Sequence, residues 1–258
     1  SAKEALDKGI EYAQEGRYDE AISAYNEAIE INRNYAQAYS NRGDAYAKLG
    51  DLSQAISDCA KAIDIDPDLA EAYYNRGNTY NKQGNLPQAI SDFTKAIKIN
   101  SNYAQAYNNR GYAYTKQGDL SKAISDCTKA IDINPGLASA YSNRGDAYTK
   151  QGDLSKAISD CTKAIDINPY LAEAYYNRGN AYGKKDDLLQ AVSDFTRAIE
   201  INPNLASAYN NRGYAYAKQG NLSRAISDYT KAIGINPDLA SVYNNRGNAY
   251  IKQGDLSK

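Results

Sequence analysis

Apolar residues follow a helical spacing along this chain, and the spacing recurs every 34 residues. Within residues 36–69, one apolar face repeats at i, i+3, i+7 and i+10 and consists of Ala36, Tyr39, Gly43 and Tyr46. A second face follows and consists of Leu52, Ala55, Ile56, Cys59, Ala62 and Ile63. Between the faces, Gly50 can end one helix and Asp51 can cap the next, and Pro67 closes the unit. Each unit therefore predicts a helical hairpin.

The unit recurs without insertion, which predicts an all-α array whose members bury their apolar faces only against their neighbours. We expect one solenoid over residues 2–258. Its repeats are 2–35, 36–69, 70–103, 104–137, 138–171, 172–205 and 206–239, with a partial repeat at 240–258. An array of this kind leaves long surfaces open to a partner.

A glycine lies inside the first helix of every unit, at Gly9, Gly43, Gly77, Gly111, Gly145, Gly179, Gly213 and Gly247. Glycine within a helix costs about 0.5 to 1 kcal/mol relative to alanine, so its recurrence needs a structural reason. We expect it to lie opposite the alanine columns that begin at Ala21 and Ala28 in the second helix. The two helices can then approach each other closely.

These residues resemble a known repeat. Glycine at position 8 of the unit, tyrosine at 11, alanine at 20 and 27, an aromatic or small residue at 24 and proline at 32 are similar to the tetratricopeptide repeat. The resemblance covers essentially the whole chain. It implies a right-handed α-solenoid of antiparallel helix hairpins, with the first helices lining a concave groove. It also implies a role in binding partner proteins or extended peptides.

Two repeats depart from the pattern. The first repeat has Ala5, Lys8 and Arg33 where later repeats have tyrosine, arginine and, in most cases, proline. In the sixth repeat, Asp186 replaces the glycine that ends the first helix, and Gly183 weakens the helix before it. We expect local looseness there.

Charge and composition exclude several functions. The formal net charge is -1 with the two signs interspersed, so the chain has no basic face for nucleic acid. The absence of histidine removes the commonest general base and metal ligand, and we expect neither enzymatic activity nor a cofactor. Apolar stretches fall short of the roughly 20 residues of a membrane helix, and no signal peptide is visible. Because the chain starts at Ser1 without methionine and stops at Lys258 in mid-repeat, we expect it to be a piece of a longer protein.

The three cysteines, Cys59, Cys127 and Cys161, share position 24, which aromatic residues fill in other repeats. This position favours buried core thiols. Neighbouring repeats stack at about 8 to 10 Å, which exceeds the roughly 7 Å Cα separation of a disulfide and also excludes a metal site. Free thiols favour a reducing compartment, so we expect a cytoplasmic protein.

Asparagine occupies position 6 without a break, at Asn41, Asn75, Asn109, Asn143, Asn177, Asn211 and Asn245. A carboxamide offers an acceptor and two donors and can therefore hold the backbone of an extended peptide. In the resembling family, such asparagine ladders do hold peptide backbone. The alternative is that each side chain bonds only within its own or a neighbouring repeat.

Position 7 is arginine from Arg42 to Arg246, and position 23 is aspartate from Asp58 to Asp228. The first repeat lacks both, with Lys8 and Ala24 in these places. Because the arginine at position 7 and the aspartate at position 23 occur together and are missing together, they predict a salt bridge within each repeat rather than an anion site.

The remaining groove positions repeat every three units. Position 5 reads Ser40, Tyr74, Asn108 and then Ser142, Tyr176, Asn210; position 9 reads Asp44, Asn78, Tyr112 and then Asp146, Asn180, Tyr214. We infer a duplicated block, residues 36–137 and 138–239, with two nearly equivalent polar subsites. The candidate peptide-binding residues in them are Asp44, Tyr74, Tyr112, Asp146, Tyr176 and Tyr214. Lysines at position 13 form the far edge of the groove.

The sequence thus favours a non-enzymatic protein-interaction scaffold that binds an extended peptide segment of a partner in its groove. One alternative is end-to-end self-association through the open last repeat. Another is a substrate-recruiting arm of an enzyme whose catalytic domain lies outside this chain.

Overall fold

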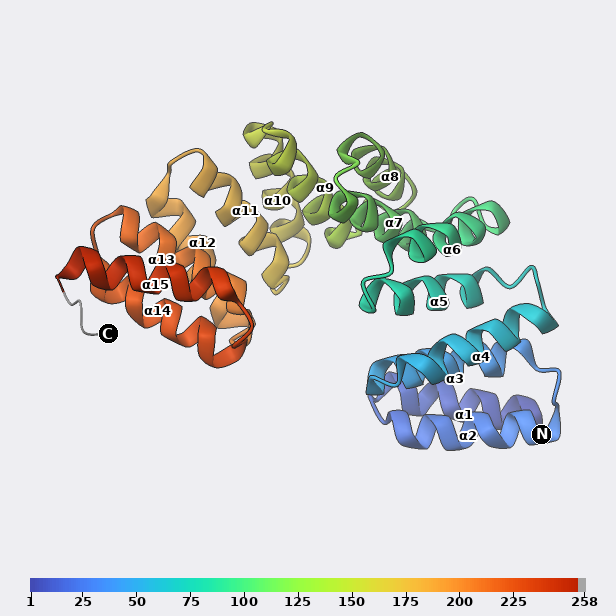
Figure 1. The fold of residues 1–258 in the computed structure, drawn as a ribbon. Coiled ribbons are helices and arrows are strands. Elements are labelled where there is room, and N and C mark those ends of the chain that lie inside the picture. Colours follow the sequence, from blue (N-terminus) through green and yellow to red (C-terminus); the bar gives the residue numbers. More distant parts are fainter. Residues whose placement is uncertain (255–258) are drawn as a thin grey trace. The chain divides into compact units, whose positions relative to one another are not determined.

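The computed structural model describes residues 1–254, which form fifteen α-helices and no strand, so the predicted all-α fold of helix hairpins is confirmed (Figure 1). The helices fall into two compact units, Ser1–Ile133 and Asn134–Lys258. The first unit contains α1 (Ala2–Gln14), α2 (Tyr18–Ile31), α3 (Ala36–Leu49), α4 (Leu52–Ile65), α5 (Ala70–Lys82), α6 (Leu86–Ile99), α7 (Ala104–Gln117) and α8 (Leu120–Ile133). The second contains α9 (Ala138–Gln151), α10 (Leu154–Ile167), α11 (Ala172–Lys184), α12 (Leu188–Ile201), α13 (Ala206–Lys218), α14 (Leu222–Ile235) and α15 (Ala240–Gln253).

The single solenoid over 2–258 stays a prediction. The second helix expected in the last repeat begins at residues 255–258, which lie outside the described part of the chain.

Helix ends follow the turn chemistry of the sequence. Gly50 adopts a left-handed conformation with φ 91° after α3, as predicted. The side chain of Asp51 then accepts a hydrogen bond of 3.0 Å from the backbone N–H of Gln54 and caps α4. Gly50 and Asp51 form the whole connection between α3 and α4, and the chain reverses its direction there, so the two helices are antiparallel.

Asp186 occupies the same left-handed position in the sixth repeat. With φ 63°, it is the one non-glycine residue among residues 1–254 that has a positive φ. A side chain in this conformation costs about 1 to 2 kcal/mol, although aspartate tolerates it better than most residues. The looseness expected in this repeat stays a prediction.

Substituting Asp186→Gly is expected to raise the free energy of unfolding by about 1 kcal/mol, because it removes the strain of the left-handed residue. The exposed ion pair of Asp186 with Lys218, 3.3 Å long, contributes little and its loss should not matter. Urea unfolding measures the change. The reverse substitution Gly152→Asp in the preceding repeat, where φ is 97°, should lower stability; equal stability of all three proteins would contradict the argument.

The first helices of successive repeats contact one another, α1 with α3, α3 with α5 and α5 with α7 in the first unit. The same holds for α9, α11, α13 and α15 in the second unit. Within the described part of each unit, second helices contact first helices but not each other. The first helices therefore form one continuous surface in each unit, which we call the inner face.

In the first seven repeats the recurrent glycine faces the side chain at position 24, whereas a Cβ atom built on Gly247 would meet nothing within 4 Å. A Cβ atom built on Gly43 would lie 2.8 Å from Cys59 Sγ and 3.0 Å from the carbonyl oxygen of Ala55. The prediction that these glycines lie opposite the alanine columns is confirmed for the column that contains Ala55, but the contact with position 24 was not predicted. The alanine contributes its backbone, and the position 24 side chain fills the space in front of the glycine.

All three cysteines are free and fully buried in this position, as predicted for core thiols. Burial raises the pKa of the Cys59 thiol to about 12, and it raises the pKa of Cys161 as well. Because the thiolate is the reactive form, these side chains are inert in the folded protein.

We expect Ellman's reagent at pH 8 to leave the native protein unlabelled and to label all three thiols in urea. The raised pKa also makes stability fall as the pH rises from about 9 towards 12, since the unfolded thiol loses its proton there while the folded one keeps it. Urea unfolding at pH 8 and pH 10 measures this. Labelling of the native protein as fast as the unfolded protein would show that the thiols are not buried.

Candidate functional site

The arginines at position 7 bind the aspartates at position 23 of their own repeats, so the predicted salt bridge is confirmed. In the fourth repeat, Arg110 Nε donates to Asp126 Oδ2 at 2.7 Å and Nη2 donates to Oδ1 at 2.8 Å. The same ion pair forms in six repeats: Arg42–Asp58, Arg76–Asp92, Arg110–Asp126, Arg144–Asp160, Arg178–Asp194 and Arg212–Asp228.

A further nitrogen of these arginines reaches the preceding repeat. Arg110 Nη1 donates to Thr94 Oγ1 at 2.9 Å, and Arg178 Nη1 donates to Thr162 Oγ1 at 3.0 Å. The column is therefore a structural element that connects each hairpin internally and to its neighbour. It is not an anion site on the inner face.

The asparagines at position 6 also bond to the preceding repeat. Asn75 Nδ2 donates to the Ser40 hydroxyl at 3.1 Å and lies 3.4 Å from the Ser40 carbonyl oxygen. Asn177 donates in the same way to the Ser142 hydroxyl at 3.0 Å and to its carbonyl oxygen at 3.2 Å. The structure thus assigns these amides a role in joining repeats.

A second bonding pattern holds the next asparagine in each block. Asn109 Nδ2 donates to the Tyr74 hydroxyl at 3.2 Å and to Asn78 Oδ1 at 2.7 Å. The same bonds recur in the second block, where Asn211 donates at 3.3 and 2.8 Å to Tyr176 and Asn180. The three-repeat period inferred from the sequence is therefore present in the hydrogen bonding of both units.

The other asparagines of the column are half-buried on the inner face. Asn41 accepts a hydrogen bond from Gln37 Nε2 at 2.8 Å, and Asn245 donates to Asn210 Oδ1 at 3.1 Å. Asn143 is half-buried as well. The use of this column as a ladder for peptide backbone stays a prediction, beside the role in joining repeats.

The four candidate tyrosines lie in two kinds of environment. Tyr74 and Tyr176 are half-buried, with ring centroids 6.0 Å from Phe93 and Phe195. Their rings belong in part to the core between helices, and only their hydroxyl groups meet the asparagine column.

Tyr112 is half-buried and Tyr214 is exposed, and each ring lies beside a lysine. The Lys116 ammonium lies 5.2 Å from the centre of the Tyr112 ring, and the Lys218 ammonium lies 5.6 Å from the centre of the Tyr214 ring. Tyr214 is 51% exposed and offers the larger free ring surface.

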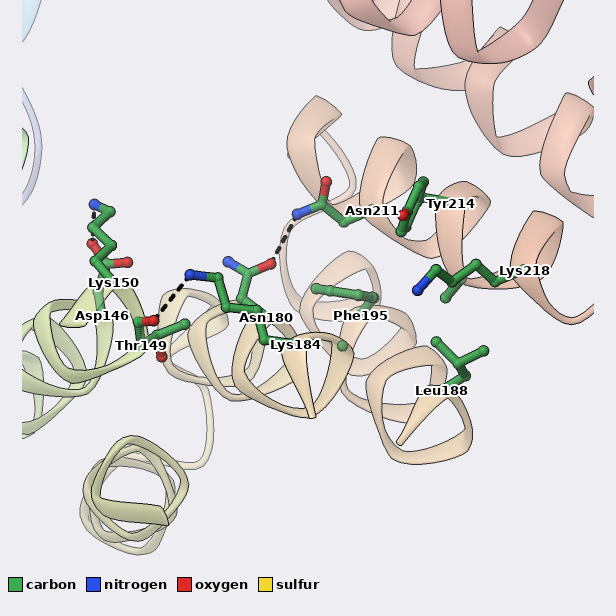
Figure 2. A pocket seen from close by; sticks show the side chains of 12 residues that line it. Asp146, Thr149, Lys150, Asn180, Lys184, Leu188, Phe195, Asn211, Tyr214 and Lys218 are labelled. Atoms are coloured by element: carbon green, nitrogen blue, oxygen red, sulfur yellow. Dashed lines mark hydrogen bonds and ion pairs between the residues drawn. The ribbon is translucent and has the colours of Figure 1, made fainter. Parts of the chain in front are cut away.

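A pocket of about 550 Å³ opens on the inner face of the second unit, between α9, α11, α13 and the start of α12 (Figure 2). It brings together three residues that the sequence proposed, Asp146, Asn211 and Tyr214. We call this cavity of the second unit the anchor pocket. Asp44, the counterpart of Asp146 in the first block, is half-buried on α3.

The floor of the anchor pocket is apolar and was not predicted. Phe195 and Leu188 contribute to it from α12, and Gly183 and Ala215 contribute from α11 and α13. Position 24 was predicted as a core position, and Phe195 at this position is only 3% exposed, but it also lines the anchor pocket. The glycine at position 183 was the available signal, because it removes a side chain there.

The rim of the anchor pocket is positively charged. Lys150 pairs with Asp146 at 2.7 Å, and Lys184 Nζ donates to the carbonyl oxygen of Thr149 at 3.0 Å (Figure 2). Lys218 lines the pocket from α13. The lining therefore contains one carboxylate, which pairs with Lys150, and three ammonium groups, of which Lys218 also pairs with Asp186 outside the lining.

Among residues 1–254, no group of three or more histidine, cysteine, aspartate or glutamate residues is placed to hold a metal ion. No helix in this part of the chain has the length and apolar character needed to cross a membrane.

Comparison with solved structures places this architecture among known helical arrays. A chain of the APC/C hetero-tetramer Cut9-Hcn1 aligns with a TM-score of 0.85 and 17% identity over 93% of this chain and 48% of that one. This chain thus spans about half of that relative. A tetratricopeptide repeat protein from Parabacteroides merdae ATCC 43184 aligns with a TM-score of 0.76 and 18% identity, over 96% and 98% of the two chains. At these identities the likeness concerns the fold.

Two relatives are more similar in sequence. YrrB, described as a TPR protein with an unusual peptide-binding site, is 26% identical with a TM-score of 0.54, over 72% of this chain and 95% of its own. The MamA protein is 30% identical with a TM-score of 0.54, over 67% of this chain and 94% of its own. No curated protein sequence matches the chain.

Family profiles match most of the sequence. A profile described as TPR repeat matches residues 9–50, 43–84, 145–186 and 213–254. Two profiles described as tetratricopeptide repeat match residues 70–103, 104–137 and 172–205, and residues 195–227. Together with the stacked helix hairpins, these matches show that the chain belongs to the tetratricopeptide repeat family.

Proposed function

We propose that this chain is a non-enzymatic protein-interaction scaffold that binds an extended peptide segment of a partner along its inner face. The observation that carries the proposal is the anchor pocket, to which first helices of three successive repeats contribute polar side chains. YrrB, a relative of 26% identity, is described as having a peptide-binding site, and the Cut9-Hcn1 relative is part of a hetero-tetramer.

The spacing of the repeats suits an extended ligand. Packed helices stand about 8 to 10 Å apart, and an extended chain advances about 3.3 Å per residue. One repeat therefore spans about three ligand residues, and three repeats span about nine. Position 6 is asparagine in each of them, so a carboxamide recurs at the same step as the ligand's backbone. A bond from Asn177 or Asn211 to the ligand would replace one of its present bonds to the preceding repeat.

Peptides selected from a random 12-residue display library test the proposal. We expect the triple variant Asn143→Ala, Asn177→Ala, Asn211→Ala to bind a selected peptide more than tenfold more weakly, because each lost hydrogen bond costs about 0.5 to 1.5 kcal/mol. Titration calorimetry measures the affinity. Thermal unfolding gives the transition temperature of the variant, and the affinity is measured below it. Unfolding caused by lost contacts between repeats then does not account for the result.

The matched control replaces three exposed serines of the second helices, Ser159, Ser193 and Ser227, with alanine. Its affinity should equal that of the original protein. Failure to select any peptide would overturn the proposed function, and unchanged affinity of the asparagine variant would overturn the ladder.

Self-association through the last repeat is a second hypothesis from the sequence. Light scattering against concentration separates it from peptide binding, since a scaffold keeps a constant mass without its ligand.

A further inference from the structure

The two blocks of three repeats differ at the anchor pocket. Most of its lining residues have an identical counterpart 102 positions earlier in the chain, such as Phe93 for Phe195 and Tyr112 for Tyr214. Two positions differ: Ala47 stands in place of Thr149, and Asn81 stands in place of Gly183. The two subsites were predicted to be nearly equivalent. They differ at position 12 of the middle repeat of each block, which carries a side chain in the first block (Asn81) and none in the second (Gly183).

Gly183 keeps the anchor pocket open. A Cβ atom built on this residue would meet only Ala191 Cβ, at 4.0 Å, so packing between helices does not require a glycine. This separates it from Gly179 one turn earlier, where an added Cβ would lie 2.8 Å from the Phe195 ring. In the first unit, the half-buried side chain of Asn81 occupies the equivalent position.

The sixth repeat carries two local features that oppose its stability, the helical Gly183 and the left-handed Asp186. Departures of this kind are expected where function requires them. Gly183 lines the anchor pocket, and Asp186 follows three residues later.

The chemistry of the pocket indicates its ligand. Phe195, Leu188 and Ala215 provide an apolar floor, and a volume of about 550 Å³ lies within the range of small ligand sites. Lys184 donates to the backbone carbonyl of Thr149, and within residues 1–254 it forms no ion pair with a carboxylate. Lys218 adds a second ammonium group 5.6 Å from the centre of the Tyr214 ring, and its ion pair with Asp186 is 3.3 Å long and exposed.

We infer that the anchor pocket binds a large apolar or aromatic side chain of the peptide, that the peptide carries a carboxylate beside this side chain, and that the first unit has no equivalent site. The inference rests on the proposed peptide-binding function and specifies its ligand class. The apolar side chain fills the space that Gly183 leaves, and Lys184 and Lys218 attract the neighbouring carboxylate.

The probes are peptides selected from the random 12-residue library on the full chain. We expect these peptides to share a Trp, Phe, Leu or Ile next to Asp or Glu. In synthetic copies, changing that apolar residue to alanine should weaken binding at least tenfold, and changing the acidic residue to its amide should weaken it several-fold and reduce its dependence on salt.

Gly183→Asn fills the anchor pocket with the residue of the first unit and should weaken binding at least tenfold. The matched control Asn81→Gly changes the equivalent position of the first unit and should leave the affinity for these peptides intact. In the Lys184→Gln variant, the affinities for the acidic peptide and for its amide copy should differ less than they do in the original protein. Circular dichroism verifies that each variant is folded.

A direct measurement on the original protein accompanies the variants. The NMR methyl signals of Leu188 and Ala215 should shift on peptide addition. If selected peptides bind Gly183→Asn as well as the original protein and leave these methyl signals unmoved, the inference is wrong while the proposed function stands. If the library yields no peptide, both are wrong.

Discussion

Replacing Arg110 with alanine is expected to lower the free energy of unfolding by about 3 to 5 kcal/mol. Arg110 is 15% exposed and its partner Asp126 is 10% exposed. Removal of the guanidinium leaves the carboxylate of Asp126 shielded from water without its two donors. It also breaks the bond to Thr94 in the preceding repeat. Urea unfolding followed by circular dichroism measures the loss.

Two comparisons make this prediction specific. Arg17→Ala removes an arginine that pairs with Glu15 and Glu20 on the surface at 46% exposure, and it should cost much less than Arg110→Ala, because solvent screens exposed ion pairs. The double variant Arg110→Met, Asp126→Leu should be more stable than Arg110→Ala, because no unpaired charge remains buried. Similar losses for Arg17→Ala and Arg110→Ala would contradict a special role for the buried pair.

Gly43→Ala is expected to destabilise the protein by about 1 to 3 kcal/mol, although alanine is the better helix former. The added methyl group would lie 3.0 Å from the backbone oxygen of Ala55 and 2.8 Å from Cys59 Sγ. The thiol can turn aside, but the backbone oxygen moves only if α4 shifts away from α3. Thermal and urea unfolding of the variant measure the change.

Gly234 of α14 provides the control for Gly43. A Cβ atom built there meets nothing within 4 Å, so Gly234→Ala should raise stability by about 0.5 to 1 kcal/mol. Adding Cys59→Ala to Gly43→Ala tests whether the thiol contributes to the clash, and we expect it to recover only part of the loss. Gains of the same sign for Gly43→Ala and Gly234→Ala would show that the helices of the hairpin are not in close contact.

The helices and their ends could be predicted from single repeats. Gly50 and Asp51 act through their own backbone and nearest neighbours, so their roles required no knowledge of tertiary contacts. The ion pair of Arg42 with Asp58 was also predictable, since both residues are missing together from the first repeat. The partner of Gly43 was less predictable, because the crossing of two helices decides whether Cys59 or Ala55 comes closest.

The candidate site depended on contacts between repeats. The sequence placed Asn75 and Asn177 in one column, but it left open whether their amides would meet a ligand or a neighbouring helix. In the structure both donate to a serine of the preceding repeat. The distance between the two first helices decides this, and no single repeat encodes that distance.

The sequence by itself determined the period, the hairpins, the helix ends and the pairing of charges, because a tandem array repeats the same short-range contacts in every unit. Only the tertiary structure decided that Phe195 reaches the inner face and that Gly183 opens a pocket above it. The physical reason is that a pocket is the space which side chains of several repeats fail to fill. Two blocks with nearly the same residues differ at two of the lining positions, Ala47 against Thr149 and Asn81 against Gly183, and these differences carry the proposal that their sites differ.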